Sequence, residues 1–290
     1  MWFNGLINFF VTLLFLTSNQ PALVLAGVES ITLKSNAPVL ELAAPRAAVL
    51  SADGRSFLYV KNGEEIQPIA SITKLMTALV FLENNPGWDQ IYKIVAADQV
   101  TGGRLNLFPG EEVTIKDLFY TSLVASDNGA TAALVHATGL SEVEFVKKMN
   151  LKARQLGLDK TKFVDPIGLS DDNVSTAREV AKLARVALDQ TAISAATQQS
   201  DYQFTTATGK IKKIESTDYL LFDVAPSSWQ VLGGKTGYTD RAGYCFVGRF
   251  KDVTGRELIS VILNSAGKNE RFRESKSLIS WVLTSYNFSR

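Results

Sequence analysis

Apolar residues recur along this chain at two spacings, which predict strands near both ends and helices between them. Between residues 71 and 84 they are three and four positions apart, which places them on one face of a helix. Similar spacing predicts helices at 115–123, 128–137, 141–156, 176–188 and 273–286. Short apolar runs bounded by turn residues predict strands at 47–50, 57–60, 244–247 and 258–263, with others around Phe204 and Val231.

This order of elements predicts an α/β (α+β) fold in one domain over residues 47–290. We expect an antiparallel sheet made from both chain ends, flanked by helices, plus an inserted helical lobe. Residues 27–46 contain Pro38 and Pro45, and their apolar residues follow neither the helical nor the strand spacing. We therefore expect a lead-in segment here, which connects the N-terminal residues to the domain.

The first residues resemble a signal peptide more than a part of the fold. No charged side chain precedes Glu29, and Leu6–Leu16 is apolar except for Asn8 and Thr12. That run is short for a membrane span and has the length of a signal-peptide core. We predict a signal peptide over residues 1–26 and an exported protein, although the usual early Lys or Arg is absent.

Composition excludes several classes of function. The chain has 30 basic and 29 acidic residues, a net charge of +1, without the basic excess typical of nucleic-acid binding. The single cysteine, Cys245, excludes an internal disulfide, and with the single histidine, His136, it makes a Cys/His zinc site improbable. A hydrolase built from this sequence needs a base other than histidine, and we expect no metal or cofactor.

Ser71 and Lys74 are candidates for that chemistry. They lie at the start of a predicted helix and three residues apart, so Lys74 can reach the Ser71 hydroxyl. A neutral lysine there could accept the serine proton, provided that burial or a neighbouring cation lowers its pKa. This S-x-x-K pattern is weak alone, since it recurs at Ser265–Lys268, where a glycine after a predicted strand indicates a loop.

Two further motifs strengthen the interpretation. Ser126-Asp127-Asn128 lies between two predicted helices, and Lys235-Thr236-Gly237 precedes the strand around Tyr244. Separately they could be a helix cap and a turn. The ordered trio S-x-x-K, S-D-N and K-T-G is typical of penicillin-binding proteins and class A β-lactamases.

The surrounding residues resemble one family within that group. Residues 70–78 resemble the active-site segment of low-molecular-weight penicillin-binding proteins, the serine D-alanyl-D-alanine carboxypeptidases and endopeptidases. Residues 235–245 resemble the third motif of that family more closely than that of a β-lactamase. Residues 163–169 and 173–178 resemble its endopeptidase branch in particular, and the resemblance covers roughly residues 40–288.

The resemblance implies a β-lactamase/transpeptidase-like fold, peptidoglycan stem peptides as substrates and β-lactam antibiotics as covalent inhibitors. It implies that Ser71 forms an acyl-enzyme and that Lys74 accepts its proton. Ser126 and Lys235 would relay protons, and Asn128 would position the peptide.

The same resemblance assigns substrate binding to the third motif. Lys235 and Thr236 would hold the terminal carboxylate of a substrate, beside Gly237. The backbone N–H groups of Ser71 and Tyr238 would form the oxyanion hole. The charge of Lys235 would also lower the pKa of Lys74. Such a protein would lie in the periplasm or at the exterior of the cell envelope, and peripheral membrane association is compatible with this.

Three alternatives stay open at this point. A class A-like β-lactamase needs a deacylating glutamate, but residues 165–169 stand where an E-x-x-L-N motif is expected. A non-catalytic penicillin or peptidoglycan receptor would have no need of Ser71 and Lys74. Between carboxypeptidase and endopeptidase we favour the endopeptidase, since the sequence ends just after its last helix without the extra C-terminal domain of many carboxypeptidases.

Overall fold

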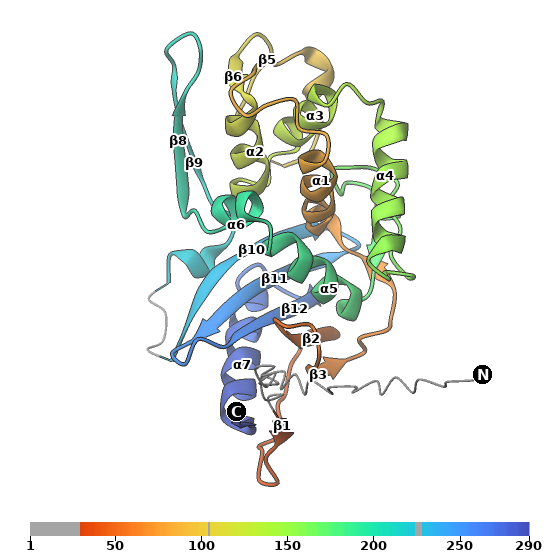
Figure 1. Cartoon of the computed structure of the whole chain (residues 1–290), viewed down its shortest axis with the longest axis vertical. Helices are drawn as coiled ribbons and strands as arrows, with labels where there is room; N and C mark the ends of the chain where they lie inside the picture. The colour runs from red at the N-terminus through yellow and green to blue at the C-terminus, as the bar shows by residue number, and fades with distance from the viewer. Residues whose placement is uncertain (1–29, 104, 224–227, 290) are drawn as a thin grey trace, which may run out of the picture.

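The computed structural model of this chain describes residues 30–103, 105–223 and 228–289. The predicted signal peptide, residues 1–26, lies outside the described residues. Figure 1 shows a sheet at the centre, a helical lobe at the top of the view and one long helix, α7 (Glu270–Ser285), toward the bottom.

The central sheet has five antiparallel strands in the order β10–β11–β12–β2–β3. These strands are β2 (Arg46–Ser51), β3 (Phe57–Lys61), β10 (Trp229–Thr239), β11 (Gly243–Asp252) and β12 (Glu257–Ser265). The two chain ends meet where β12 pairs with β2, with Val261 opposite Ala48. The predicted sheet made from both ends of the chain is therefore confirmed.

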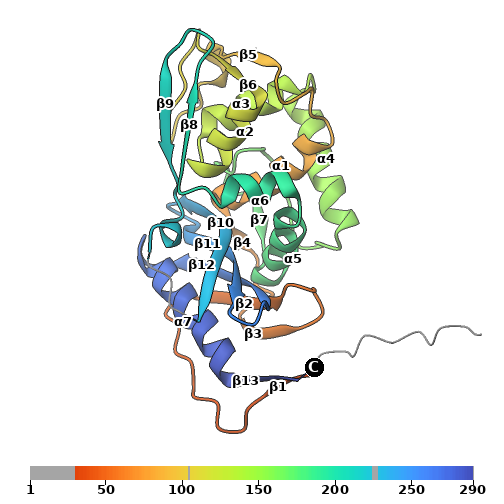
Figure 2. The same cartoon turned by 60° about the vertical axis from the view of Figure 1, so that its left-hand side comes forward.

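Each face of this sheet buries apolar side chains against different helices. In β2, Ala48 belongs to the core shared with the helical lobe, whereas the next residue, Val49, belongs to the core under α7. This alternation follows from the two-residue side-chain period of a strand. Figure 2 shows α7 on one side of the sheet, with α5 (Ala177–Leu188) and α6 (Thr191–Thr197) on the other.

The helical lobe lies between β3 and β10 in the chain and contains most of the predicted helices. They are α1 (Thr73–Leu82), α2 (Ile115–Val124), α3 (Asn128–Ala137) and α4 (Glu142–Gln155). These four confirm the helices predicted from apolar spacing. α6 was not predicted from the sequence, because a helix of only seven residues has too few turns to show a helical period.

Short strand pairs complete the fold. They are β1 (Ser30–Leu33) with β13 (Tyr286–Ser289), β4 (Gln67–Pro68) with β7 (Val174–Ser175), β5 (Ile91–Lys93) with β6 (Glu112–Thr114), and β8 (Asp201–Thr205) with β9 (Ile211–Glu215). The strand predicted around Phe204 exists as β8, but it belongs to a hairpin beside the helical lobe and not to the central sheet.

The predicted lead-in segment has more structure than its sequence pattern indicates. It contains β1, and its Leu42 and Ala44 are buried in the core under α7. The pairing of β1 with β13 joins residues from opposite ends of the chain, which a local sequence pattern cannot reveal.

Aromatic side chains fill the centre of the helical lobe. Phe119 of α2 lies 5.6 Å from Phe81 of α1 and 5.2 Å from Trp88, measured between ring centroids, and it is fully buried. Close packing of these rings fixes α1, which carries Lys74, against α2, which leads to Ser126.

We therefore expect Phe119→Ala to destabilise the protein by about 3–5 kcal/mol, because the substitution leaves a cavity between α1 and α2. The measurement is the midpoint of chemical denaturation. Phe222→Ala is the matched control, since Phe222 is half exposed and should change the midpoint little. Equal midpoints for the two variants would contradict this account of the core.

Candidate active site

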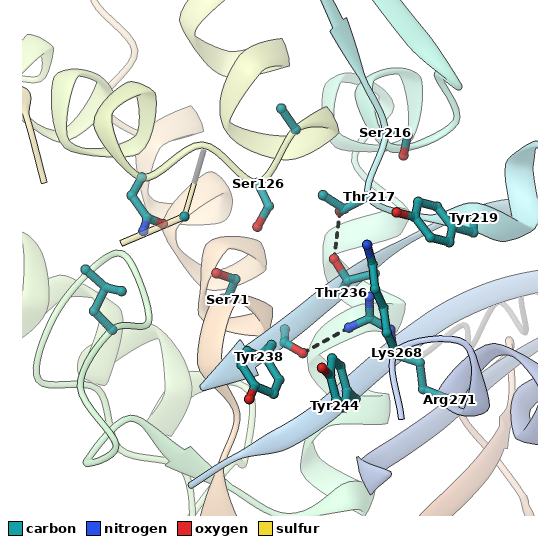
Figure 3. Close-up of a pocket in the computed structure, with 15 residues that line it drawn as sticks. Ser71, Ser126, Ser216, Thr217, Tyr219, Thr236, Tyr238, Tyr244, Lys268 and Arg271 are labelled. Carbon is teal, nitrogen blue, oxygen red and sulfur yellow. Dashed lines mark hydrogen bonds between the residues drawn. The ribbon is translucent and has the colours of Figure 1, made fainter. Parts of the chain in front are cut away.

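The three sequence motifs meet at one cavity of about 360 Å³ between the helical lobe and the β10 edge of the sheet. Figure 3 shows Ser71, Ser126 and Thr236 facing the same space. The predicted residues that line it are Ser71, Ser126, Asn128, Thr236, Gly237 and Tyr238. Lys74 and Lys235 are each only 1% exposed and lie beneath this lining.

Lys74 makes three hydrogen bonds from the first full turn of α1. Its Nζ lies 2.9 Å from Ser71 Oγ, 2.8 Å from Asn128 Oδ1 and 2.8 Å from the Ile167 carbonyl oxygen. A protonated amine has three N–H donors, so these acceptors would satisfy it completely. A neutral amine would keep two of the bonds as a donor and direct its lone pair at the Ser71 hydroxyl.

Burial lowers the pKa of Lys74 from 10.5 to about 7, while the negative charges of Asp127 and Asp165 act in the opposite direction. Of the two causes expected from the sequence, burial and a neighbouring cation, burial acts most strongly on the pKa of Lys74. Desolvation is the cause, because the enclosed amine loses the water that would stabilise its charged form.

Lys235 forms a second lysine–serine pair in the cavity. From β10, its Nζ donates to Ser126 Oγ at 2.6 Å and to the Thr236 carbonyl oxygen at 3.0 Å. Burial lowers the pKa of Lys235 as well, and the positive charges of Lys74 and Arg271 lower it further. The third motif lies inside an edge strand, so its alternative interpretation as a turn is wrong.

Two non-glycine residues of the site have left-handed backbone conformations. Ala70, directly before Ser71, has a φ of 48°, and Ser126 has a φ of 58°. Such residues typically cost about 1–3 kcal/mol each and persist only where surrounding packing holds them. Both place a serine hydroxyl at the cavity, which indicates strain retained for the geometry of the site.

Two glycines lie close against the turn before Ser71. A Cβ on Gly237 of β10 would lie 2.8 Å from the Ile69 carbonyl oxygen, and one on Gly168 would lie 2.2 Å from the Ala70 carbonyl oxygen. Gly168 also has a φ of 87°, which favours glycine. The glycine of the third motif therefore has a steric reason: β10 approaches the serine turn too closely for a side chain.

The loop over residues 163–173 is fixed by its own side chains. The Asp165 carboxylate accepts backbone N–H bonds from Ile167, Gly168 and Ser170 at 2.6–2.8 Å. Asn173 adds contacts to the loop and to Thr73 of α1. This loop thereby presents the Ile167 carbonyl oxygen to Lys74.

Asn128 and Thr236 also have partners within the site. Asn128 Nδ2 donates to the Gly102 carbonyl oxygen at 2.7 Å, while its Oδ1 accepts from Lys74. Thr236 Oγ1 donates to Thr217 Oγ1 at 2.7 Å. The Tyr238 ring is half exposed at the cavity and stacks on Tyr244, 4.3 Å away.

Sequence reasoning missed several residues of this cavity, above all Arg271. Its guanidinium lies in the wall and donates to the carbonyl oxygens of Gly237 and Cys245 at 3.1 and 3.3 Å. Lys268, from the second S-x-x-K pattern, also lines the cavity, whereas Ser265 of that pattern is buried at the end of β12. A single basic residue at the start of a helix belongs to no motif, so nothing in the sequence marks it as part of the site.

The remaining candidates for chemistry lie elsewhere. Cys245 is buried, and burial raises the pKa of its thiol to about 11. His136, at the end of α3, pairs through Nδ1 with Asp98 at 2.6 Å. Within the described ranges, no group of three or more His, Cys, Asp or Glu side chains is placed to hold a metal ion. None of the helices described here is long and apolar enough to span a membrane.

Comparison of the sequence with known proteins identifies relatives of the same kind. The D-alanyl-D-alanine endopeptidase of Escherichia coli is 30% identical over 248 residues, covering 84% of this chain and 78% of that protein. The D-alanyl-D-alanine endopeptidase of Haemophilus influenzae is 36% identical over 217 residues, covering 74% and 73%. The D-alanyl-D-alanine carboxypeptidase of Bacillus subtilis is 32% identical, covering 84% and 63%.

Solved structures support the same relationship. A penicillin-binding protein from Listeria monocytogenes in its cefotaxime-bound form has a TM-score of 0.72 and 32% identity, covering 85% of this chain and 99% of that one. A DD-transpeptidase from Streptomyces has a TM-score of 0.77 and 25% identity, covering 85% and 99%. The expected β-lactamase/transpeptidase-like fold is confirmed.

The sequence model of the D-alanyl-D-alanine carboxypeptidase family matches residues 32–267, a range that includes all three motifs. Together with the relatives above, this confirms the resemblance noted in the sequence. The chain belongs to the D-alanyl-D-alanine carboxypeptidase family of serine peptidases.

Proposed function

We propose that this protein is a serine DD-peptidase that cleaves peptidoglycan stem peptides through an acyl-enzyme at Ser71. It would act as an endopeptidase on cross-links and as a carboxypeptidase on terminal D-alanine. The observation that carries the proposal is the buried Lys74 amine, 2.9 Å from the Ser71 hydroxyl at the cavity floor. An amine with a pKa near 7 is suited to act as a base at neutral pH.

In the first step, neutral Lys74 accepts the Ser71 proton while Ser71 Oγ forms a bond to the scissile carbonyl carbon. Negative charge then develops on the carbonyl oxygen. The backbone N–H groups of Ser71 and Tyr238 are our candidates for stabilising it, an effect of about 3–4 kcal/mol per donor in comparable enzymes.

In the second step the C–N bond breaks, and the leaving amine needs a proton. The Ser126 hydroxyl accepts a hydrogen bond from Lys235 and can pass its own proton to the amine, with Lys235 as the source of the replacement. Before deacylation Lys74, whose pKa is about 7, loses to solvent the proton that it took from Ser71, and Lys235 regains a proton from solvent. Water then attacks the ester carbonyl, neutral Lys74 accepts a proton from that water, and the ester C–O bond breaks. This releases the acyl product and returns the proton to Ser71.

The cavity also suits a leaving group with a carboxylate beside the scissile amide. Thr236 and Arg271 line it, Lys235 lies just beneath, and no Asp or Glu among the described residues lines it. A substrate carboxylate next to Lys235 would favour the protonated form of that lysine, because an opposite charge raises a lysine pKa.

The relatives favour the endopeptidase reaction, and the site argues against a β-lactamase. The relatives from Escherichia coli and Haemophilus influenzae are named as endopeptidases. Asp165, the acid nearest to the expected position of a deacylating glutamate, directs both its oxygens at its own loop backbone. It is therefore not free to activate water, so an acyl-enzyme formed with penicillin should persist.

The proposal includes export, since peptidoglycan lies outside the cytoplasmic membrane. The predicted signal peptide over residues 1–26 supports it, and we assign the catalytic domain to residues 47–290. β-Lactams would inhibit the protein by acylating Ser71, as their resemblance to a strained D-alanyl-D-alanine amide implies.

Ser71→Ala and Lys74→Arg should each lower activity by at least about 10³-fold, because one lacks the nucleophile and the other has no neutral base. The measurement is digestion of purified cross-linked muropeptides, scored as monomers formed from dimers and as D-alanine released. Lys276→Arg is the control, since Lys276 pairs with Asp223 on the surface of α7. Full activity of Ser71→Ala would refute the proposal.

Acylation should depend on pH through Lys74. Because its pKa is lowered to about 7 and the neutral amine is the base, the rate constant should fall about tenfold per pH unit below 7 and level off above. The measurement is the second-order rate of labelling by a fluorescent penicillin between pH 5.5 and 8.5. A rate that is flat over this range, or that falls as the pH rises, would exclude Lys74 as the base.

Benzylpenicillin should be consumed in a burst of one equivalent, followed by slow turnover, because none of the carboxylates in the part of the chain that the structure describes lines the cavity to activate water. The burst is measured by absorbance and the acyl-enzyme by mass spectrometry. Rapid repeated hydrolysis, near the roughly 10 s⁻¹ typical of enzymes, would instead indicate a β-lactamase.

A further inference from the structure

The α7 side of the cavity has two cationic side chains, of which the reaction above uses only Arg271. Lys268 and Arg271 come from the turn before α7 and from its first turn, and both line the cavity. Figure 3 shows their side chains together on the Tyr219 side of the cavity, across Thr236 from Ser71. Arg271 is buried, whereas Lys268 is exposed.

An aromatic ring supports the exposed Lys268 side chain. Its Nζ lies 4.8 Å from the centroid of the Tyr219 ring, close enough for a cation–π contact. Tyr219 in turn packs on Phe272 of α7, 5.6 Å away. Lys268 makes no hydrogen bond or ion pair with any described side chain, in contrast to Lys276 of the same helix, which pairs with Asp223.

The backbone that presents Lys268 is anchored. Ser265, at the end of β12, donates to Glu274 of α7 at 2.6 Å, and the Arg271 N–H donates to the Gly267 carbonyl oxygen at 3.2 Å. These contacts join both ends of the turn to α7. The anchored backbone and the Tyr219 ring together place the ammonium group at the cavity mouth, where it is exposed to solvent.

The two cations differ in depth, so they suit different groups of a substrate. The Arg271 guanidinium lies in the wall beside the Gly237 carbonyl oxygen, where it would face a carboxylate adjoining the scissile amide in the proposed reaction. Lys268 lies farther out at the cavity mouth. With Arg271 facing that first carboxylate, Lys268 remains available for a second anionic group. A leaving D-alanine has no second anionic group to offer. A leaving stem peptide from a cross-link has one, because it ends in its own carboxylate.

We propose that Lys268 is a specificity-determining residue that binds a second carboxylate on the leaving group and so favours cleavage of cross-links. This rests on the proposed function and deepens it. It gives the second S-x-x-K pattern of the sequence a role through its lysine alone, since Ser265 is turned into the core.

The test uses synthetic peptides with one acyl part ending in D-alanine and different leaving residues. D-Glutamate and D-glutamine form a matched pair that differs only in the second charge, and D-2-aminoadipate and its side-chain amide form a longer pair. We expect the full-length wild-type protein to show a kcat/KM about three- to tenfold higher for the acid of at least one pair. That range is typical of an ion pair that stays partly exposed to solvent.

In Lys268→Ala the acid-to-amide ratio should fall to about one, and in Lys268→Glu it should invert. Lys268→Arg should retain the preference, and 0.5 M NaCl should reduce it in the wild type by screening. Lys276→Ala is the matched control and should keep the wild-type ratio. Labelling by a fluorescent penicillin verifies that each variant has a folded site.

The outcomes separate the two proposals. If the wild-type protein cleaves none of these peptides and no cross-linked muropeptide, the proposed function fails. If it cleaves them without preferring the acid of either pair, or if Lys268→Ala keeps the preference, the role of Lys268 is refuted and the proposed function stands.

Discussion

Burial of the Lys74 amine is the constraint on which the rest of the site depends. Lowering a lysine pKa from 10.5 to about 7 corresponds to about 5 kcal/mol of disfavoured charge, which the fold must offset elsewhere. Its three acceptors come from the serine turn, the first residue of α3 and the loop over residues 163–173. Those segments are distant in sequence, so the amine is correctly placed only when the whole helical lobe has packed.

The sheet supplies the other half of the site through one edge strand. β10 can lie against the serine turn because Gly237 lacks a side chain, and this contact carries Lys235 to Ser126. The strained conformation of Ala70 persists where Gly237 and Gly168 pack closely against the serine turn, and Ser126 is bonded to Lys235. The cavity therefore lies where the helical lobe meets the sheet: the Ser71–Lys74 pair belongs to the lobe, and the second pair joins Lys235 of the sheet to Ser126 of the lobe.

Much of this could be predicted from the sequence, for two physical reasons. Helical periodicity over ten or more residues is a strong local signal, and it located α1 to α5. The order of the three motifs predicted that Ser71, Ser126 and Lys235 converge. The sequence could not predict Arg271 or the β1–β13 pairing, because both depend on contacts between distant segments. Nor could it decide between burial and the charge of Lys235 as the main cause of the low Lys74 pKa, since the extent of burial cannot be seen in a motif.

The residues proposed to cleave the bond and the residue proposed to select the substrate lie in different parts of the site. Residues that would break the bond are buried and linked to several elements, so a change at Lys74 or Gly237 disturbs the packing of both halves. Lys268 stands on an anchored turn at the cavity mouth, and its side chain contacts only the Tyr219 ring among the interactions described. A substitution there alters the charge offered to a leaving group while the acceptors of Lys74 stay in place. Selection for different cross-links can therefore act on the α7 turn without disturbing the base.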